Sequence, residues 1–301
     1  AALARALDLL GYEVTLYTET AAAMGLHEME KVLGTSVPVE ELELDNREHF
    51  HAIAQKLDMC LFTEKLGMNE KGLQHSVTGR SRSGNRAYVD WIAWEMNELG
   101  KTTIGIGDGG NEIGFGKVFM AARKLIDHGE ECLCGCGGGI ITRTATTYLY
   151  PVSISNWGCY ALCAALAIGT ENKKLLVLPE EEAAMLNRCI EIELVDGGTG
   201  EARFAIDGVD GEVSVGLVRM LQEMVEITLS VNNRAFCFSS SSLSFFHSTA
   251  SGPSLFFSGG GPDAVWLVRI SVVLGLKLEK SPRMTAYRTN GRGFSPHDQM
   301  S

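Results

Sequence analysis

The sequence lacks the motifs that mark several common enzyme classes. It contains no G-x-S-x-G elbow and no G-x4-G-K-[ST] phosphate loop, and its seven histidines include no H-x-x-x-H pair. These absences leave a hydrolase triad and a P-loop nucleotide site without support. Basic residues are also scarce, with 26 Lys and Arg against 37 Asp and Glu. Because nucleic acids and anionic membranes bind to basic surfaces, we expect neither as a partner.

The eight cysteines form no recognisable disulfide framework. Cys132, Cys134 and Cys136 alternate with Leu and Gly, whereas zinc ribbons space their ligands as C-x2-C pairs, and no second pair lies downstream. We therefore interpret these cysteines as free thiols in a reducing compartment, which predicts an intracellular protein. No segment has the pattern of a signal or transit peptide, and the apolar residues 263–279 are too short and too interrupted by charge for a membrane span.

Alternating helix and strand patterns predict an α/β fold. Residues 1–10 carry leucines at helical spacing, and residues 13–18 are rich in β-branched and aromatic residues. This order is the second half of a βαβ unit, whose first strand and loop would precede residue 1. The alternation continues to about residue 230 and predicts a layered sandwich, with a mainly parallel sheet covered by helices on both faces. Residues 231–301 turn Ser-, Phe- and Gly-rich, so we expect a disordered or poorly folded tail after a domain at 1–230.

A glycine-rich segment with acidic residues is the strongest candidate for a site. Residues 105–117 read GIGDGGNEIGFGK, between a predicted buried strand and a predicted helix. Glycines let a backbone approach a ligand closely, and the N–H groups at a helix start favour an anion. Asp108, Asn111 and Glu112 add polar groups at the carboxyl end of a strand, where open α/β sheets bind ligands. The alternative is a tight strand–helix turn with Asn111 as the helix cap.

Two further segments could bind a small molecule. Residues 79–88 carry three arginines in a loop with two glycines, and guanidinium groups bind carboxylates through two parallel hydrogen bonds; a solvated basic loop is the alternative. Residues 153–160 read SISNWGCY, in which Ser155 or Asn156 could instead cap a helix and Trp157 could be part of the core. The stretches 195–200 and 206–208 contain Asp-Gly, which predicts hairpin turns.

These segments, taken in order, resemble the D-glutamate cyclase family. The resemblance is carried by GRSRSGN (79–85), IGIGDGGNEIGFGK (104–117), VSISNWGCYAL (152–162) and VDGGTG (195–200), and it covers about residues 1–230. It implies an α/β sandwich, a lyase that dehydrates D-glutamate to 5-oxo-D-proline, and a mitochondrial location in animals. The implied partner is a small amino-acid substrate, and the sequence does not indicate an oligomeric state.

For that reaction, the substrate amine attacks the γ-carboxyl carbon and an oxygen leaves as water, which requires a base and an acid. We hypothesise that Asp108 and Glu112 exchange these protons. Asn111 is the third predicted catalytic residue. The other predicted site residues bind substrate, with Arg80 on the α-carboxylate: Arg80, Asn85, Gly109, Gly110, Asn156, Trp157 and Gly158. Asn111 and Asn156 would hold the oxyanion or the amine.

No organic cofactor is expected. Asp108 and Glu112 could hold Mg²⁺ or Mn²⁺ through oxygen ligation, and their spacing alone does not decide this question. Two other functions stay open: a phosphate- or nucleotide-dependent enzyme that uses the glycine loop at 105–116, and a non-catalytic remnant of the cyclase domain.

Overall fold

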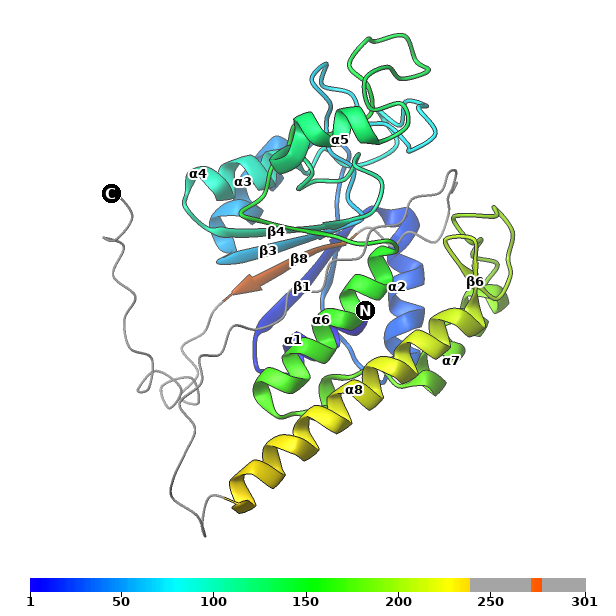
Figure 1. Cartoon of the computed structure of the whole chain (residues 1–301). Helices are drawn as coiled ribbons and strands as arrows, with labels where there is room; N and C mark the ends of the chain where they lie inside the picture. The colour runs from blue at the N-terminus through cyan, green and yellow to red at the C-terminus, as the bar shows by residue number, and fades with distance from the viewer. Residues whose placement is uncertain (239–271, 278–301) are drawn as a thin grey trace, which may run out of the picture.

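Six strands form one sheet in the order β2-β1-β8-β3-β4-β5 (Figure 1). The computed structural model describes residues 1–238 and 272–277. Neighbouring strands are parallel in the pairs β1–β2, β3–β4 and β4–β5, whereas β8 runs antiparallel between β1 and β3. The sheet is therefore mainly parallel, as predicted. The strands are β1 (Glu13–Thr18), β2 (Val39–Glu41), β3 (Met59–Thr63), β4 (Thr102–Gly107), β5 (Tyr148–Pro151) and β8 (Val272–Lys277).

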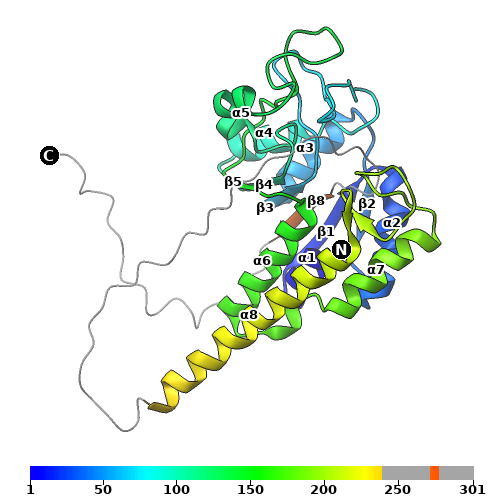
Figure 2. The ribbon, with the colours of Figure 1, turned by 45° about the vertical axis from the view of Figure 1, so that its right-hand side comes forward.

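Helices cover both faces of this sheet (Figure 2). On one face lie α3 (Arg47–Lys56) and α4 (Asp90–Glu98), and on the other lie α1 (Ala2–Leu9), α6 (Ser155–Thr170) and α8 (Gly211–Phe238). The remaining elements are α2 (Thr20–Leu33), η1 (Gly116–Val118), α5 (Phe119–Leu125), η2 (Lys173–Leu175), α7 (Pro179–Glu191), β6 (Ala205–Ile206) and β7 (Val209–Asp210). The predicted α/β sandwich is confirmed.

The two-residue period of the strands divides the core into two clusters. Leu16 and Leu61 pack with α1, α6 and α8, while their neighbours Tyr17 and Phe62 pack against α3 and α4. Successive strand side chains point to opposite faces, so a parallel strand buried on both faces is apolar throughout. This explains why these strands lack a polar face.

The chain reverses its direction of travel across the sheet between β1 and β3. It runs outward from β1 to β2, and then returns past β1 to add β3, β4 and β5 on the other side. In open α/β sheets, ligands bind beyond the carboxyl ends of the strands at such a reversal. The fold therefore directs attention to the residues that follow β1, β3, β4 and β5.

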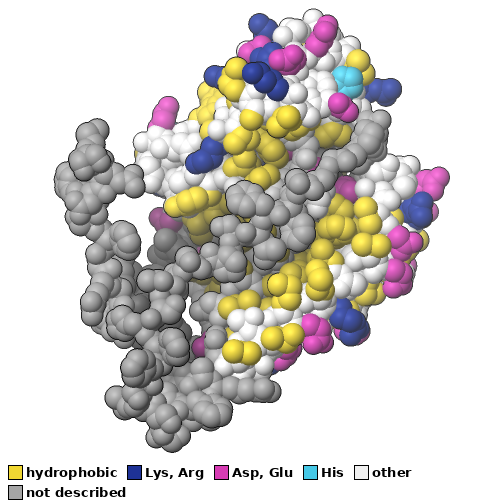
Figure 3. Space-filling view, in the orientation of Figure 1, with side chains coloured by type: hydrophobic (Ala, Val, Ile, Leu, Met, Phe, Trp, Pro, Cys, Tyr) yellow, Lys and Arg dark blue, Asp and Glu magenta, His cyan; other side chains and the backbone are white. Residues whose placement is uncertain are grey.

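The predicted domain boundary at residue 230 falls inside α8, which continues to Phe238. Residues 272–277 of the predicted tail form β8. The rest of that tail, 239–271 and 278–301, lies outside the described residues. Several apolar side chains of α8 are exposed: Val213, Met220, Met224, Ile227 and Val231. Apolar groups also follow this helix in Figure 3.

Some local predictions hold and others fail. No strands of the described chain flank residues 195–200, so the hairpin predicted there is wrong. The Asp207-Gly208 turn joins β6 and β7, and both residues have positive φ, 48° and 80°, as a two-residue hairpin requires. The helix of residues 155–170, however, has Ile154 at its N-cap position with no side-chain hydrogen bond. Ser155 is its first residue, so the predicted cap at Ser155 or Asn156 is wrong. Within the described part of the chain, no helix has both the length and the apolar character that crossing a membrane requires.

Gly105 allows β4 to lie directly against a returning loop. A Cβ at this position would stand 2.3 Å from the carbonyl oxygen of Ile113, which is backbone and cannot turn aside. We predict that Gly105→Ala lowers the free energy of unfolding by about 1–3 kcal/mol or more, because such overpacking forces the backbone to shift. Urea denaturation followed by circular dichroism measures this change.

Gly169→Ala is the matched control. Gly169 lies in the last turn of α6, where an added Cβ meets no atom within 4 Å. This variant should be neutral or up to about 1 kcal/mol more stable, since Ala favours helix. Equal effects of the two substitutions would contradict the close approach at Gly105.

Candidate active site

Three carboxyl groups converge beyond the ends of β3 and β4. Glu64, Asp108 and Glu112 each offer an oxygen within 4.8 Å of the others. Glu64 and Glu112 are buried, whereas Asp108 is partly exposed. The structure thus brings together the two predicted proton-transfer residues and adds Glu64, which the sequence analysis missed.

Glu64 reaches this position through an unusual backbone turn. Its N–H still donates to the carbonyl of Ile106 at 3.0 Å, which continues the pairing of β3 with β4. Its φ is +58°, a left-handed conformation that costs a non-glycine residue of order 1–2 kcal/mol. Ser155, at the start of α6, donates its hydroxyl to the Glu64 carboxylate. The positive end of α6 therefore faces a carboxylate from β3.

Glu112 is held against β4 by a close backbone approach. A Cβ on Gly107 would lie 2.8 Å from Cβ of Glu112, so only glycine fits there. The backbone N–H of Gly109 donates to Oε2 of Glu112 at 3.1 Å, so the carboxylate bonds within its own loop. The glycine loop therefore directs the Glu112 side chain inward. A binding site requires this orientation, whereas a simple strand–helix turn does not.

Asn111 links this loop to His75 through its side chain. The side chain is fully buried, and its Nδ2 donates to the carbonyl of His75 at 2.8 Å. Its Oδ1 is buried without a hydrogen-bond partner among the described residues. Gly109 is half-buried and Gly110 is buried against Ile126 and Ile141. Of the predicted loop residues, Asn111 and Gly110 thus take part in packing and Gly109 in holding Glu112.

A buried ion pair adjoins the carboxyl groups. Lys65 is 1% exposed and its Nζ lies 2.7 Å from Oε2 of Glu19, the residue that follows β1. Oε1 of Glu19 accepts from the N–H of Ala87 at 2.9 Å. Burial acts to raise the pKa of Glu19, but the Lys65 ammonium and these hydrogen bonds outweigh it, so the net pKa lies below its usual value. Burial lowers the pKa of Lys65, and the neighbouring Glu19 carboxylate opposes this effect.

The predicted arginine loop forms a group of cations beside this pair. Partial burial lowers the pKa of Arg82, and the nearby guanidinium groups of Arg86 and Arg80 act in the same direction. Arg80 and Asn85 are exposed, and the carbonyl of Asn85 accepts from Arg86 at 3.0 Å. Arg86 directly precedes Ala87, which bonds to Glu19. Like charges gathered in this way favour an anion.

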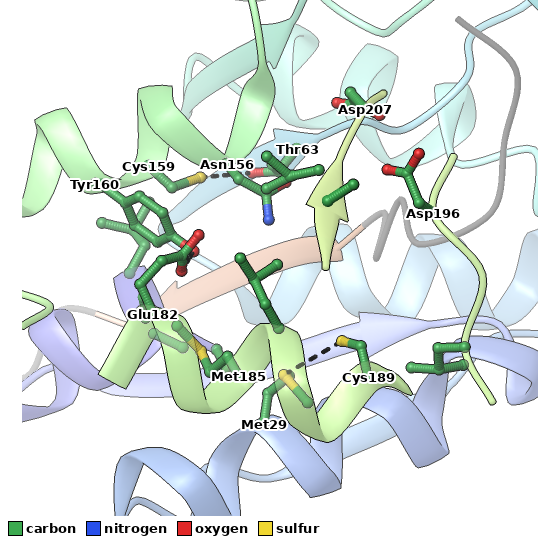
Figure 4. Close-up of a pocket in the computed structure, with 18 of the residues that line it drawn as sticks. Met29, Thr63, Asn156, Cys159, Tyr160, Glu182, Met185, Cys189, Asp196 and Asp207 are labelled. Atoms are coloured by element: carbon green, nitrogen blue, oxygen red, sulfur yellow. Dashed lines mark hydrogen bonds between the residues drawn. The ribbon is translucent and has the colours of Figure 1, made fainter. Parts of the chain in front are cut away.

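A cavity of about 120 Å³ lies on the α6 side of the site (Figure 4). Thr63, Asn156 and Cys159 line one side, and Met185 of α7 lies on the side opposite them. Burial raises the pKa of Cys159 to about 11, and the Glu64 carboxylate acts in the same direction. Thr63 directly precedes Glu64 in the chain, although Glu64, Asp108 and Glu112 are not themselves among the residues that line the cavity. Other polar lining groups are Glu182, Asp196, Arg203 and Asp207.

The cavity wall contains a buried hydrogen-bond network. Glu182 is 1% exposed and accepts from the hydroxyl of Tyr160 at 2.5 Å and from that of Ser214 at 2.6 Å. Trp157 donates its indole N–H to Ser214 at 3.0 Å. Burial raises the pKa of Glu182, although both hydrogen bonds oppose this effect.

The three predicted residues of the SNWG segment have different surroundings. Asn156 lines the cavity. Trp157 is half-buried, packs against the core and bonds to Ser214, and Gly158 lets α6 approach Val152, since a Cβ would lie 2.9 Å from that side chain. The structure therefore places Asn156 at the cavity and Trp157 and Gly158 in supporting positions.

Comparison with known proteins agrees with this arrangement. Residues 1–224 match the family described as D-glutamate cyclase-like, C-terminal. The chain belongs to this family. The match covers nearly the whole range over which the sequence resembles the family, and includes every residue of the carboxyl group cluster.

A curated human relative, "D-glutamate cyclase, mitochondrial", is 27% identical to this chain over 151 residues. The match covers 43% of this chain and 23% of the relative. The match thus spans less than a quarter of the relative's length. Membership of the D-glutamate cyclase-like family supports a cyclase or lyase class of enzyme.

The buried pair of Lys65 and Glu19 gives a test of the site's electrostatics. We predict that Lys65→Met alone lowers the free energy of unfolding by about 3–5 kcal/mol, because it leaves the Glu19 carboxylate buried without its cation. The double variant Lys65→Met with Glu19→Leu should recover much of this loss. Urea unfolding at neutral pH measures both.

Lys31 provides the control, because its Nζ contacts Glu28 at 2.5 Å with 70% of its side chain exposed. Lys31→Met should change stability by at most about 1 kcal/mol. A loss for Lys65→Met that is no larger than this would show that the buried pair does not hold β1 to β3.

Proposed function

We propose that this domain dehydrates D-glutamate to 5-oxo-D-proline, with the carboxyl groups of Glu64, Asp108 and Glu112 as the proton-transfer centre. The observation that carries this proposal is their convergence within 4.8 Å, at the edge where such sheets bind ligands. Family membership supports the reaction class. The relative's name adds the substrate.

The proposed reaction needs only proton transfers. The amine nitrogen bonds to the γ-carboxyl carbon of the substrate, and one C–O bond of that carboxyl breaks. The ammonium nitrogen loses two protons, and the leaving oxygen gains two protons and departs as water. No redox partner is required.

A group of close carboxyls is suited to this exchange. Carboxyls of like charge disfavour one another's ionisation, so the cluster holds protonated and ionised members together. An ionised member accepts a proton from the ammonium, and a protonated member delivers one to the leaving oxygen. In this scheme Asp108, the partly exposed member, contacts the substrate, and Glu64 and Glu112 share the proton with it.

Asn156 and a cation complete the binding site. Asn156 lines the cavity beside Thr63 and supplies amide groups for the amine or the tetrahedral oxygen. The α-carboxylate needs a cation: the sequence analysis assigned Arg80, with Asn85 assisting, but Arg203 lines the cavity itself. Its place in the wall favours Arg203.

We include no organic cofactor in the proposal. The oxygen ligands of Glu64, Asp108 and Glu112 also suit Mg²⁺ or Mn²⁺, and assays with a chelator and with each added cation decide whether one assists. The proposed substrate is an amino acid, and we propose a mitochondrial location from the name of the human relative.

Incubation of the full chain with D-glutamate should yield 5-oxoproline, measured by chiral chromatography against L-glutamate and a blank. Glu112→Gln and Asp108→Asn should each lower kcat by about 100-fold or more, which is the contribution of a positioned acid or base. Both replacements keep the shape of the side chain.

Asp127→Asn is the control for these variants. Asp127 is an exposed carboxylate after α5, so this variant should retain full turnover. Turnover that survives Asp108→Asn and Glu112→Gln unchanged would remove the carboxyl groups from the mechanism. Binding of D-glutamate without product would favour the non-catalytic alternative, and stabilisation by phosphate compounds alone would favour the phosphate-binding one.

The assignment of the α-carboxylate is tested separately. Arg203→Met should raise KM for D-glutamate by at least about 10-fold, because a charge-assisted hydrogen bond contributes about 1.5–3 kcal/mol. Arg80→Met should change KM by less. The reverse order would return this role to Arg80.

A further inference from the structure

A second cluster of ligating side chains lies apart from the carboxyl groups. His75 and the cysteines at 132, 134 and 136 place one ligand atom each within 4.8 Å of one another. Sγ of Cys132 is 3.2 Å from Sγ of both Cys134 and Cys136. Nε2 of His75 is 3.1 Å from Sγ of Cys134 and 3.9 Å from Sγ of Cys136.

These separations are close to those of a four-coordinate metal site, with three of the distances a few tenths of an ångström shorter. Zinc binds sulfur at about 2.3 Å and nitrogen at about 2.0 Å in a tetrahedron, so its ligand atoms lie about 3.4–3.8 Å from one another. Three sulfurs and one imidazole nitrogen form one of the recurrent ligand sets of structural zinc. The sequence analysis rejected a metal here because it looked for a second cysteine pair, whereas the fourth ligand lies 57 positions upstream of Cys132.

The backbone curls to bring the alternate cysteines together. In an extended chain, side chains two residues apart share a face but lie about 6–7 Å apart. Gly135 and Gly137 have φ of +77° and +71°, left-handed values that turn the chain between and after the ligands. This loop is anchored to the arginine loop, because the N–H of Leu133 donates to the carbonyl of Gly79 at 2.9 Å.

The imidazole of His75 is oriented as a ligand. The residue is fully buried, and its Nδ1 lies 3.2 Å from the carbonyl oxygen of Leu73. A carbonyl only accepts, so Nδ1 carries the proton and Nε2 turns its lone pair toward the sulfurs. Metal-binding histidines are held in this way by a hydrogen bond from the other ring nitrogen.

Backbone and amide N–H groups surround the sulfurs. Sγ of Cys136 accepts from the N–H of Gly138 and from Nδ2 of Asn69, each at 3.4 Å. Asn69 is 3% exposed, and its Oδ1 accepts from the N–H groups of Lys71 and Leu73. Such donors stabilise the thiolate that zinc requires.

We propose that His75, Cys132, Cys134 and Cys136 bind one structural Zn²⁺. Four protein ligands close the coordination sphere, so the ion has no open position for a substrate. It fastens the loop at 130–139 to the loop at 69–86. The carbonyl of His75 accepts from Asn111, so the same ion steadies the loop that carries Asp108 and Glu112.

The test begins with the full chain, purified with a reductant and without added metal. Inductively coupled plasma mass spectrometry should find about one zinc per chain, and Cys134→Ser and His75→Ala should each retain at most about a tenth of it. Cys189→Ser is the control, since Cys189 lies in α7 outside the cluster; it should keep its zinc.

Cobalt gives a second readout that does not depend on activity. Co²⁺ added to the reduced, zinc-depleted chain should produce a thiolate charge-transfer band and tetrahedral d–d bands in the wild type and in Cys189→Ser, but not in Cys134→Ser. Cys134 is exposed, so its replacement leaves no cavity and keeps the test valid if His75→Ala fails to fold. Asn69→Ala should weaken zinc binding by about 10–100-fold.

Two results would overturn the proposal. One is a wild-type chain whose cysteines are shown by thiol titration to be reduced, and which neither contains zinc nor binds Co²⁺. The other is zinc content that His75→Ala and Cys134→Ser leave equal to the wild type. Neither result depends on turnover of D-glutamate, so this test is independent of the proposed function.

Discussion

Repulsion among the carboxyl groups of Glu64, Asp108 and Glu112 is the constraint that the surrounding structure has to satisfy. Their oxygens lie within 4.8 Å of one another, and in a partly buried site such charges interact far more strongly than in water. The fold meets this with donors: the hydroxyl of Ser155 to Glu64 and the N–H of Gly109 to Glu112. In the proposed mechanism, a proton shared within the cluster would reduce the remaining repulsion.

These carboxyl groups depend on two neighbouring strands of the sheet, so the geometry of the site depends on how those strands are held together. Glu64 follows β3 in a left-handed conformation, while Asp108 and Glu112 follow β4. The glycines of β4 let the loop return against the strand with almost no space to spare. Because the groups stand on buried parallel strands with packed helices on both faces, the sheet can maintain an arrangement that is locally unfavourable.

The sequence predicted the elements that carry a local signal and missed those that depend on distant contacts. The glycine-rich loop was predicted as a site because its polar residues follow a strand, and the structure brings Asp108 and Glu112 together. Glu64 was missed because Glu-Lys after a weak strand pattern resembles an exposed turn. Trp157 belongs to a segment predicted as a site, yet it packs half-buried against the core, since an aromatic side chain can serve packing as well as binding.

The same limit applies to the metal-ligand cluster. A cysteine triplet is visible in the sequence, but His75 joins it only through the packing of two loops. No spacing rule covers a ligand 57 residues away. Contacts of this kind become visible only when the backbone of both loops is in place.

The position of β8 between β1 and β3 explains why a long buried pair, Lys65 and Glu19, connects the ends of these two strands. Neighbouring strands are about 4.8 Å apart, so β1 and β3, with β8 between them, are separated by about 9.6 Å. Only long side chains cross that distance, and Lys65 and Glu19 meet there at 2.7 Å. Burying these charges costs free energy, and the ion pair opposes that cost by linking the parallel strands β2-β1 to the parallel strands β3-β4-β5. An apolar pair of equal length would span the gap too, but it would not provide the charge that orders Ala87 and the arginine loop beyond it.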